Sequence, residues 1–165
     1  MLYNRVDVAM RELVADFSCL QADDLVERLA RAAAAVAGTA YAGFVRVDPL
    51  RREALPVHLH GPPGDPLRIG RWLAESGVLK ELALSAGTLR LAQDAAVGEP
   101  GFLATLVPVV AREHTFVWVA GRGFGDADEH LLGRFATAAG RALEAASGLE
   151  AAVRMLRGIR AFRPA

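Results

Sequence analysis

Cysteine is almost absent from this chain, since Cys19 is the only one among 165 residues. A single thiol cannot form a disulfide within the chain, so nothing in the sequence indicates an oxidising compartment. The first residues include acidic side chains and lack the long apolar centre of a signal peptide. We therefore expect a cytoplasmic protein.

An excess of charge of either sign is also missing, because 19 Lys and Arg residues balance 19 Asp and Glu residues. A pI near 6.9 gives no general attraction to nucleic acids or to anionic membranes. The longest uncharged run, 32–45, is too short and too interrupted by glycine for a membrane span. We expect neither nucleic acid nor membrane as a partner, and 53% apolar residues are enough for one domain with a real core.

The common catalytic and nucleotide-binding motifs are missing as well. The chain contains no Gly-x-Ser-x-Gly elbow, no P-loop and no zinc motif. Gly121, Gly123 and Gly125 superficially resemble a dinucleotide loop, but the spacing lacks the third glycine of that fingerprint and a turn explains them better. We expect a protein that is not an enzyme.

The most informative stretch that the sequence does contain is 101–125. Two apolar runs rich in β-branched residues, 102–111 and 115–120, flank a polar break at 112–114. This pattern predicts a buried antiparallel hairpin at the centre of a sheet. Both alternating sets of side chains in the first run are apolar, so the sheet should be covered on both faces.

The remaining elements follow from hydrophobic periodicity and from glycine and proline breaks. Asp126 and Glu129 have the spacing of a capping box, which predicts that a long helix begins at 126. The predicted order is a helix from 23 or 24 to 36, strands at 41–48 and 54–60, a loop at 61–66, short helices around 67–73 and 78–83, a strand at 88–92, a loop at 93–101, the hairpin and the long helix.

Two apolar stripes with alternating spacings of three and four lie at the two ends of the chain. They comprise Tyr3, Val6, Met10, Leu13, Phe17 and Leu20, and then Leu132, Phe135, Ala139, Ala142, Ala146, Leu149, Val153 and Leu156. Each stripe could pack on its own domain, and Gly148 could divide the second into two helices. The alternative is that the stripes pair across a twofold axis in a four-helix bundle.

We predict the second arrangement, a homodimer with coiled-coil character. Its interface residues are predicted as Val6, Met10, Leu13, Phe17, Leu132, Phe135, Ala139, Ala142, Leu149 and Val153. The predicted organisation is a dimerisation helix at 1–21, a sensory domain at 22–147 and an extension of the last helix at 148–165.

Three stretches of the sequence resemble the GAF family. They are LAESGVLKELALSAGTLRLAQD at 73–94, LATLVPVVAREHTFVWVAGR at 103–122, with Pro108 in the position of a mid-strand proline, and GFGDADEHLLGRFATAAGRALEAA at 123–146. The resemblance covers roughly 22–146 and is closest to GAF domains of actinobacterial sensor histidine kinases and related regulators. It implies an α+β fold, an α/β/α sandwich in which the terminal helices cover one face of an antiparallel sheet. Loops and short helices cover a ligand pocket on the other face.

The resemblance also implies a regulatory role in bacterial signal transduction, as in two-component systems. Aromatic surfaces with a few polar anchors are typical of a small-molecule site. On this basis we predict a pocket wall from Arg46, His58, His60, Trp72, Arg90, Phe102, Thr105 and Trp118. Core packing is the alternative for Trp72, Phe102 and Trp118, and a solvated edge is the alternative for the arginines.

No cofactor is expected. The stretch between the third and fourth strands holds no His to ligate haem by the family's route, and Cys19 is remote from the predicted pocket, which argues against a bilin and against sulfoxide reductase chemistry. His58 and His60 could ligate a metal or haem only if a third group joined them.

Three functions therefore stay open. The first is a dimeric domain that senses a small ligand or a partner protein, the second is a scaffold with a filled pocket, and the third is a haem or metal redox sensor through His58 and His60. A closed core around Trp118 would favour the scaffold.

Overall fold

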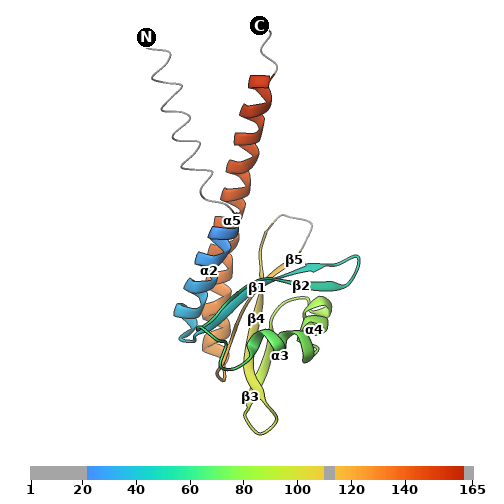
Figure 1. Ribbon diagram of the computed structural model, residues 1–165, viewed down its shortest axis with the longest axis vertical. Coiled ribbons are helices and arrows are strands. Elements are labelled where there is room, and N and C mark those ends of the chain that lie inside the picture. Colours follow the sequence, from blue (N-terminus) through green and yellow to red (C-terminus); the bar gives the residue numbers. More distant parts are fainter. Residues whose placement is uncertain (1–21, 110–113, 162–165) are drawn as a thin grey trace.

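A computed structural model describes residues 22–109 and 114–161 (Figure 1). In these ranges the chain forms helices α2 (Ala22–Ala37), α3 (Ile69–Glu75), α4 (Val78–Leu84) and α5 (Asp126–Ala161), and strands β1 (Tyr41–Asp48), β2 (Glu53–His60), β3 (Leu89–Asp94), β4 (Glu99–Val107) and β5 (His114–Ala120). The α+β fold and the order of elements are as predicted. The stripe predicted in the first twenty residues and most of the polar break at 112–114 lie outside the described residues.

The five strands form one antiparallel sheet in the order β2-β1-β5-β4-β3. The predicted hairpin is confirmed, because β4 pairs with β5 from Phe102 opposite Ala120 to Val107 opposite Thr115. β5 is the middle strand and is hydrogen-bonded on both sides. The apolar stretch at 101–125 is therefore the centre of the sheet.

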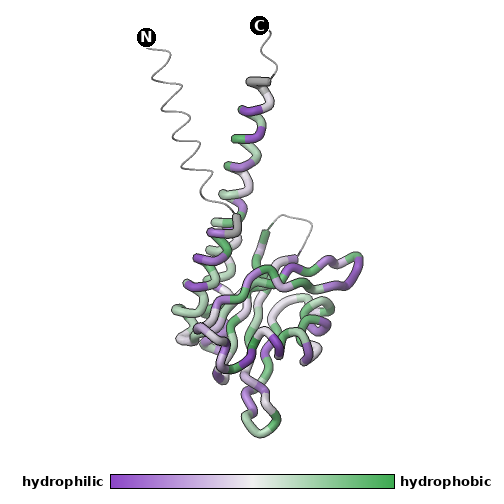
Figure 2. The backbone as a smooth tube through the Cα atoms, in the orientation of Figure 1, coloured by the Kyte–Doolittle hydropathy of each residue, from purple (hydrophilic) through white to green (hydrophobic). Residues whose placement is uncertain are grey.

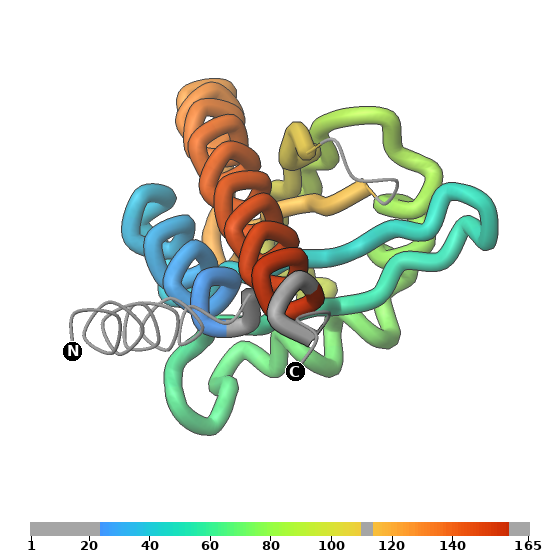
Figure 3. Tube along the Cα trace, turned by 90° about the horizontal axis from the view of Figure 1, so that it is seen from above, coloured from blue at the N-terminus to red at the C-terminus, as the bar shows by residue number. Residues whose placement is uncertain are grey.

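Helices cover both faces of the sheet, as the apolar character of both side-chain sets predicted. The helix side, covered by α2 and α5, buries small residues such as Ala33 and Ala136 against strand residues such as Phe44 and Val119. Figure 3 shows α2 and α5 side by side on this face. The opposite side, which we call the aromatic side, is covered by α3 and α4 and contains Trp118.

Two sequence expectations differ from the structure at the ends of β4. The loop predicted at 93–101 is largely a hairpin, in which Asp94 pairs with Glu99 around a turn. Most of its residues are exposed, so the hairpin carries no hydrophobic alternation that the sequence could display. Pro108 follows the end of β4 and does not interrupt a strand, consistent with the lack of a proline N–H for the ladder.

Close backbone contacts join the beginning of β4 to the segment that leads into α5. The Gly121 N–H donates to the Gly101 carbonyl over 3.1 Å. Gly101 has a φ of 78°, and a Cβ there would lie 1.9 Å from the carbonyl oxygen of Arg122. Only glycine satisfies both conditions at this position.

The long helix α5 begins at Asp126 as predicted, but the capping box is different. The Asp128 carboxylate reaches back to accept the Gly125 N–H over 2.8 Å, while Asp126 is exposed and pairs with Arg90. The helix continues through Gly148 without a break to Ala161. Figure 2 shows hydrophobic and hydrophilic residues interspersed along the part of α5 that projects from the body. None of the described helices is both long enough and apolar enough to cross a membrane.

Candidate functional site

The aromatic side of the sheet contains a continuous row of three rings. Trp118 and Phe102 are fully buried and stack with centroids 5.8 Å apart, and Trp72 of α3 meets Phe102 at 5.4 Å with a tilt of 47°. A Cβ on Gly43 of β1 would lie 2.5 Å from Cζ2 of Trp118, so the indole passes directly over this glycine. Side chains therefore fill the middle of this face, and the core around Trp118 is closed.

The Trp118 indole N–H is buried and has no hydrogen-bond partner among the described residues. A buried donor without a partner generally costs about 1 to 3 kcal/mol. The stacked ring must therefore contribute mainly through its apolar volume and its contact with Phe102.

Strand register divides the eight predicted site residues between the two faces, because residues directly opposite each other in a sheet point to the same side. Trp72, Phe102 and Trp118 belong to the aromatic side. The other five point to the helix side. Four of them lie opposite residues of the helix-side core, and Arg46 lies two residues along β1 from Phe44 of that core. The five are Arg46, His58, His60, Arg90 and Thr105. The single pocket wall predicted from all eight is wrong, since the sheet itself separates the two groups.

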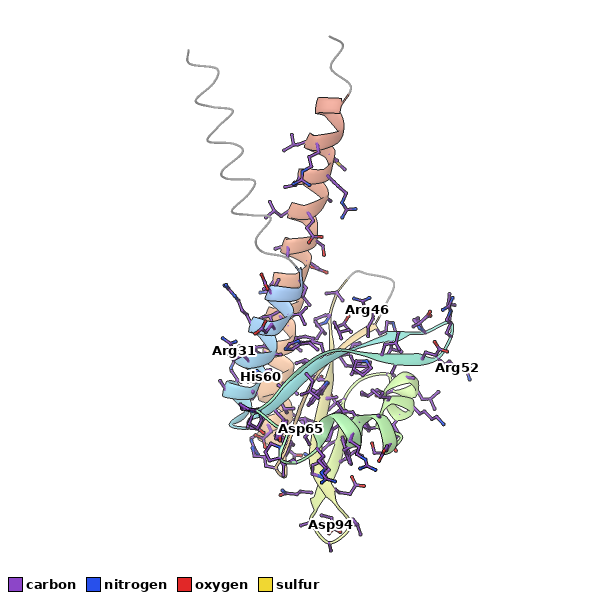
Figure 4. The ribbon with its side chains drawn as sticks, viewed as in Figure 1. Arg31, Arg46, Arg52, His60, Asp65 and Asp94 are labelled. Carbon is purple, nitrogen blue, oxygen red and sulfur yellow. The ribbon has the colours of Figure 1, made fainter. Side chains whose placement is uncertain are left out.

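The helix-side residues have structural contacts of their own. Arg90 pairs with Asp126 at 2.8 Å and with Glu129 at 3.5 Å, which ties β3 to the first turn of α5. The hydroxyls of Thr105 and Thr88 lie 3.3 Å apart. Figure 4 shows Arg46 and Asp94 at well-separated ends of the body. The ring nitrogen Nε2 of His58 is buried without a partner in the described part of the chain.

His58 and His60 lie opposite Phe44 and Ala42, both in the helix-side core. Among the described residues, no group of three or more His, Cys, Asp or Glu side chains is placed to hold a metal ion. The pair is thus on the face away from α3 and α4.

Next to the closed aromatic core lies an open cavity of about 340 Å³, which we call the Trp72 hollow. It is formed by α3, α4 and the β3–β4 hairpin, and its lining residues are Trp72, Ser76, Val78, Glu81, Leu91, Ala92, Asp94, Val97 and Glu99. The Trp72 indole N–H donates to a carboxylate oxygen of Glu99 over 3.2 Å. Of the predicted site residues, only Trp72 lines this hollow.

A turn that the sequence analysis missed holds α3 in place. The Asp65 carboxylate accepts the N–H groups of Ile69 at 2.8 Å and Gly70 at 3.0 Å, and the Tyr41 hydroxyl accepts the Leu67 N–H at 3.0 Å. Burial alone would raise the pKa of Asp65, but these backbone hydrogen bonds outweigh it and lower the pKa below its usual value. The Asp-Pro dipeptide ahead of an apolar run was the available signal for this helix start.

A second anchored carboxylate, Asp128, lies where β5 leads into α5. Arg122 donates to Asp128 over 2.6 Å and to the Ala37 carbonyl at the end of α2 over 2.6 Å, and its guanidinium lies 4.4 Å from the centre of the Phe124 ring. The Arg122 hydrogen bond, followed by that from the Gly125 N–H, lowers the pKa of Asp128. Arg122 thus joins the end of α2 to the first turn of α5.

Comparisons with known proteins identify the architecture. No protein-family model matches the sequence, and no curated protein matches it either. Among solved structures, the chain is similar to GAF3 of Slr1393 from Synechocystis, solved in its photoproduct state, with a TM-score of 0.56 and 13% identity over 77% of this chain and 96% of that one. This chain has a GAF fold.

Two further solved structures agree with this GAF fold. The GAF domain/HD domain protein of Geobacter sulfurreducens gives a TM-score of 0.50 and 18% identity, over 76% of this chain and 93% of that one. The second GAF domain of DevS from Mycobacterium smegmatis gives a TM-score of 0.50 and 16% identity, over 77% of this chain and 96% of that one. Identities this low establish the fold alone.

The GAF fold uses half of the predicted α5 interface for its own core. Leu132 and Ala139 are 1% exposed, and Phe135 packs against the helix-side core. These side chains contact the chain's own sheet and α2, so their prediction as partner contacts is wrong for Leu132 and Ala139. Ala142 and Val153 are half-buried, and Leu149, farther along α5, is exposed. Val6, Met10, Leu13 and Phe17 lie outside the described residues.

Proposed function

We propose that this chain is a cytoplasmic regulatory GAF domain of bacterial signal transduction that works as a homodimer and transmits its state through α5. The projecting part of α5 is the observation that carries this proposal. Leu149 and Leu156 remain 36% and 51% exposed there, with Val153 between them at heptad spacing. Such a stripe on a projecting helix is typical of a coiled-coil partner surface. The sequence resemblance further favours a sensor histidine kinase or a related regulator as its context.

Light scattering of the purified chain at micromolar concentration tests the dimer. We expect twice the chain mass of 17.5 kDa. The double variant Leu149→Asp with Val153→Asp places charge in the stripe and is expected to give monomers that keep their fold. The double variant Ser147→Asp with Ala151→Asp is the matched control, because it adds the same two charges four residues apart at exposed positions outside the stripe and should leave a dimer. A monomeric wild-type chain would contradict the proposal.

A scaffold that only dimerises is the second candidate function, and the closed core favours it. Trp118, Phe102 and Phe116 are fully buried beneath α3 and α4, where a GAF pocket was expected. A ligand that the domain senses would then have to bind beside this core and not within it. No comparable observation favours the haem or metal sensor through His58 and His60.

An absorption spectrum of the purified protein tests whether it carries a coloured cofactor. We expect no band above the protein absorption, because the proposal needs no haem, flavin or bilin. A visible band that disappears in a double variant with alanine at 58 and 60 would instead support the redox sensor.

A further inference from the structure

We propose that the Trp72 hollow binds a small organic cation, an ammonium or guanidinium compound with an apolar part. The hollow lies beside the centre of the aromatic side, which Trp118 and Phe102 close. This inference names the ligand class for the proposed regulatory domain and rests on that function for its biological meaning. Binding itself can be measured independently.

The charged side chains that line the hollow are all acidic. Glu81, Asp94 and Glu99 line it, and no Lys, Arg or His is among the lining residues. In the described part of the chain, none of these three carboxylates forms an ion pair. The chain as a whole has no net charge. The hollow is therefore a local concentration of negative charge, which attracts a cation.

The walls of the hollow favour an organic cation over a metal ion. Trp72, Val78, Leu91 and Val97 supply aromatic and aliphatic surface between the carboxylates. Because no described group of acidic side chains is placed to hold a metal, the carboxylates surround the space without converging on one point. An indole face attracts ammonium and guanidinium groups, and apolar walls bind the carbon skeleton attached to them.

Glu99 is the anchor of the site. Its carboxylate is half-buried and accepts the Trp72 indole N–H, which fixes the ring and the charge relative to each other. The second oxygen of the carboxylate remains able to accept a hydrogen bond from a ligand N–H. A ligand between Glu99 and Glu81 would connect the β3–β4 hairpin with α4.

The site lies close to the beginning of the output helix. Gly101, two residues after Glu99, is in contact with Arg122, whose side chain holds the first turn of α5. A ligand that shifts β4 at Glu99 would therefore act on the Arg122 contact. This short route connects the Trp72 hollow to α5.

The two tryptophans provide a direct readout by NMR, because the chain has only two indole N–H signals and Trp72→Phe assigns them. Phenethylammonium is the probe, and 2-phenylethanol is the neutral control of nearly the same shape. We expect the cation to shift the Trp72 signal in a saturable manner at millimolar concentration, with little change at Trp118. We expect no such shift from 2-phenylethanol.

Glu99→Gln keeps an acceptor for the indole N–H and removes the charge, so it should weaken binding about fivefold. Glu53→Gln on β2 is the matched control and should leave the affinity unchanged, since Glu53 is exposed and outside the hollow. Equal shifts with 2-phenylethanol, equal weakening by both variants, or no shift at 20 mM phenethylammonium would each overturn the inference. Light scattering on the same samples shows separately whether the proposed dimer is present.

Discussion

Alanines of α2 and α5 pack on the helix side of the sheet, whereas large rings on the strands themselves fill the aromatic side. On the helix side, Ala30, Ala33 and Ala136 are fully or almost fully buried, so two long helices approach the strands closely. On the aromatic side, α3 and α4 have seven residues each and cannot cover the sheet alone. Trp118 and Phe102 supply the missing volume there. Both faces are densely packed, but in different ways. On the helix side the helix backbones lie close to the strands, and on the aromatic side bulky rings fill the space.

Removing the largest ring should break the aromatic side most severely. Trp118→Ala is expected to lower the free energy of unfolding by about 3 to 5 kcal/mol, because it leaves a cavity at the stacking contact with Phe102. Urea denaturation measures the loss. Trp72→Ala is the control and should cost clearly less, since Trp72 is only half-buried. A larger loss at Trp72 than at Trp118 would contradict the closed core.

A single added methyl group should test the close approach on the helix side. A Cβ at Gly140 would lie 2.3 Å from the carbonyl oxygen of Pro108, so Gly140→Ala is expected to cost about 1 to 3 kcal/mol. Gly148→Ala is the matched control in the same helix, with nothing within 4 Å, and should stabilise by up to about 1 kcal/mol through helix propensity. Stabilisation by both changes would show that α5 does not need to approach so closely.

The connection between the two helices of the helix side depends on Arg122. Arg122→Ala should lower the free energy of unfolding by about 1 to 2 kcal/mol, because Asp128 and the Ala37 carbonyl lose their charged donor. Arg154→Ala removes an exposed arginine paired with Glu150 at 4.0 Å and should have almost no effect. Urea denaturation of both variants measures the two losses in free energy of unfolding. Equal losses would contradict a structural role for Arg122 between α2 and α5.

The start of α3 on the aromatic side should show the smallest effect, as a pH dependence. The pKa of Asp65 is lowered in the folded chain, so its stabilising contribution is present above the unfolded pKa of about 4 and is lost as the pH falls through the folded value. Asp65→Asn should therefore reduce stability at pH 7 and flatten its decline below about pH 4. Urea midpoints between pH 3 and pH 7 measure this difference, and parallel curves for the two proteins would contradict it.

The sequence was sufficient for the order of the elements and for the position of the central hairpin, because hydrophobic periodicity and glycine breaks are local signals. It could not assign faces. Strand alternation places Phe102 and Thr105, which are three residues apart in β4, on opposite faces of the sheet. Because most residues of both sets are apolar, the sequence does not show which set meets α3 and α4 and which meets α2 and α5. The irregular pairing between Phe44 and Val45 further alters the β2 register that places His58.

The Trp72 hollow was also beyond the reach of the sequence, apart from Trp72 itself. Glu99 and Asp94 fell in a stretch that was predicted as a loop, and their proximity to α3 and α4 depends on the β3–β4 hairpin.

In the first part of α5, the apolar stripe correctly predicted a buried face. The stripe does not show whether the same chain or a partner covers that face. For Leu132 and Ala139, the covering residues belong to the same chain.

The uninterrupted course of α5 has a mechanical consequence. Thirty-six residues at 1.5 Å each make a rod about 54 Å long, anchored at its first turn by Arg122 and Arg90. A tilt of about 5° at that anchor would displace the far end by about 5 Å, which is close to the rise of one helical turn. A helix of this length would therefore turn an adjustment at its base that is too small to disturb the core into a displacement on the scale of a whole side chain at its far end.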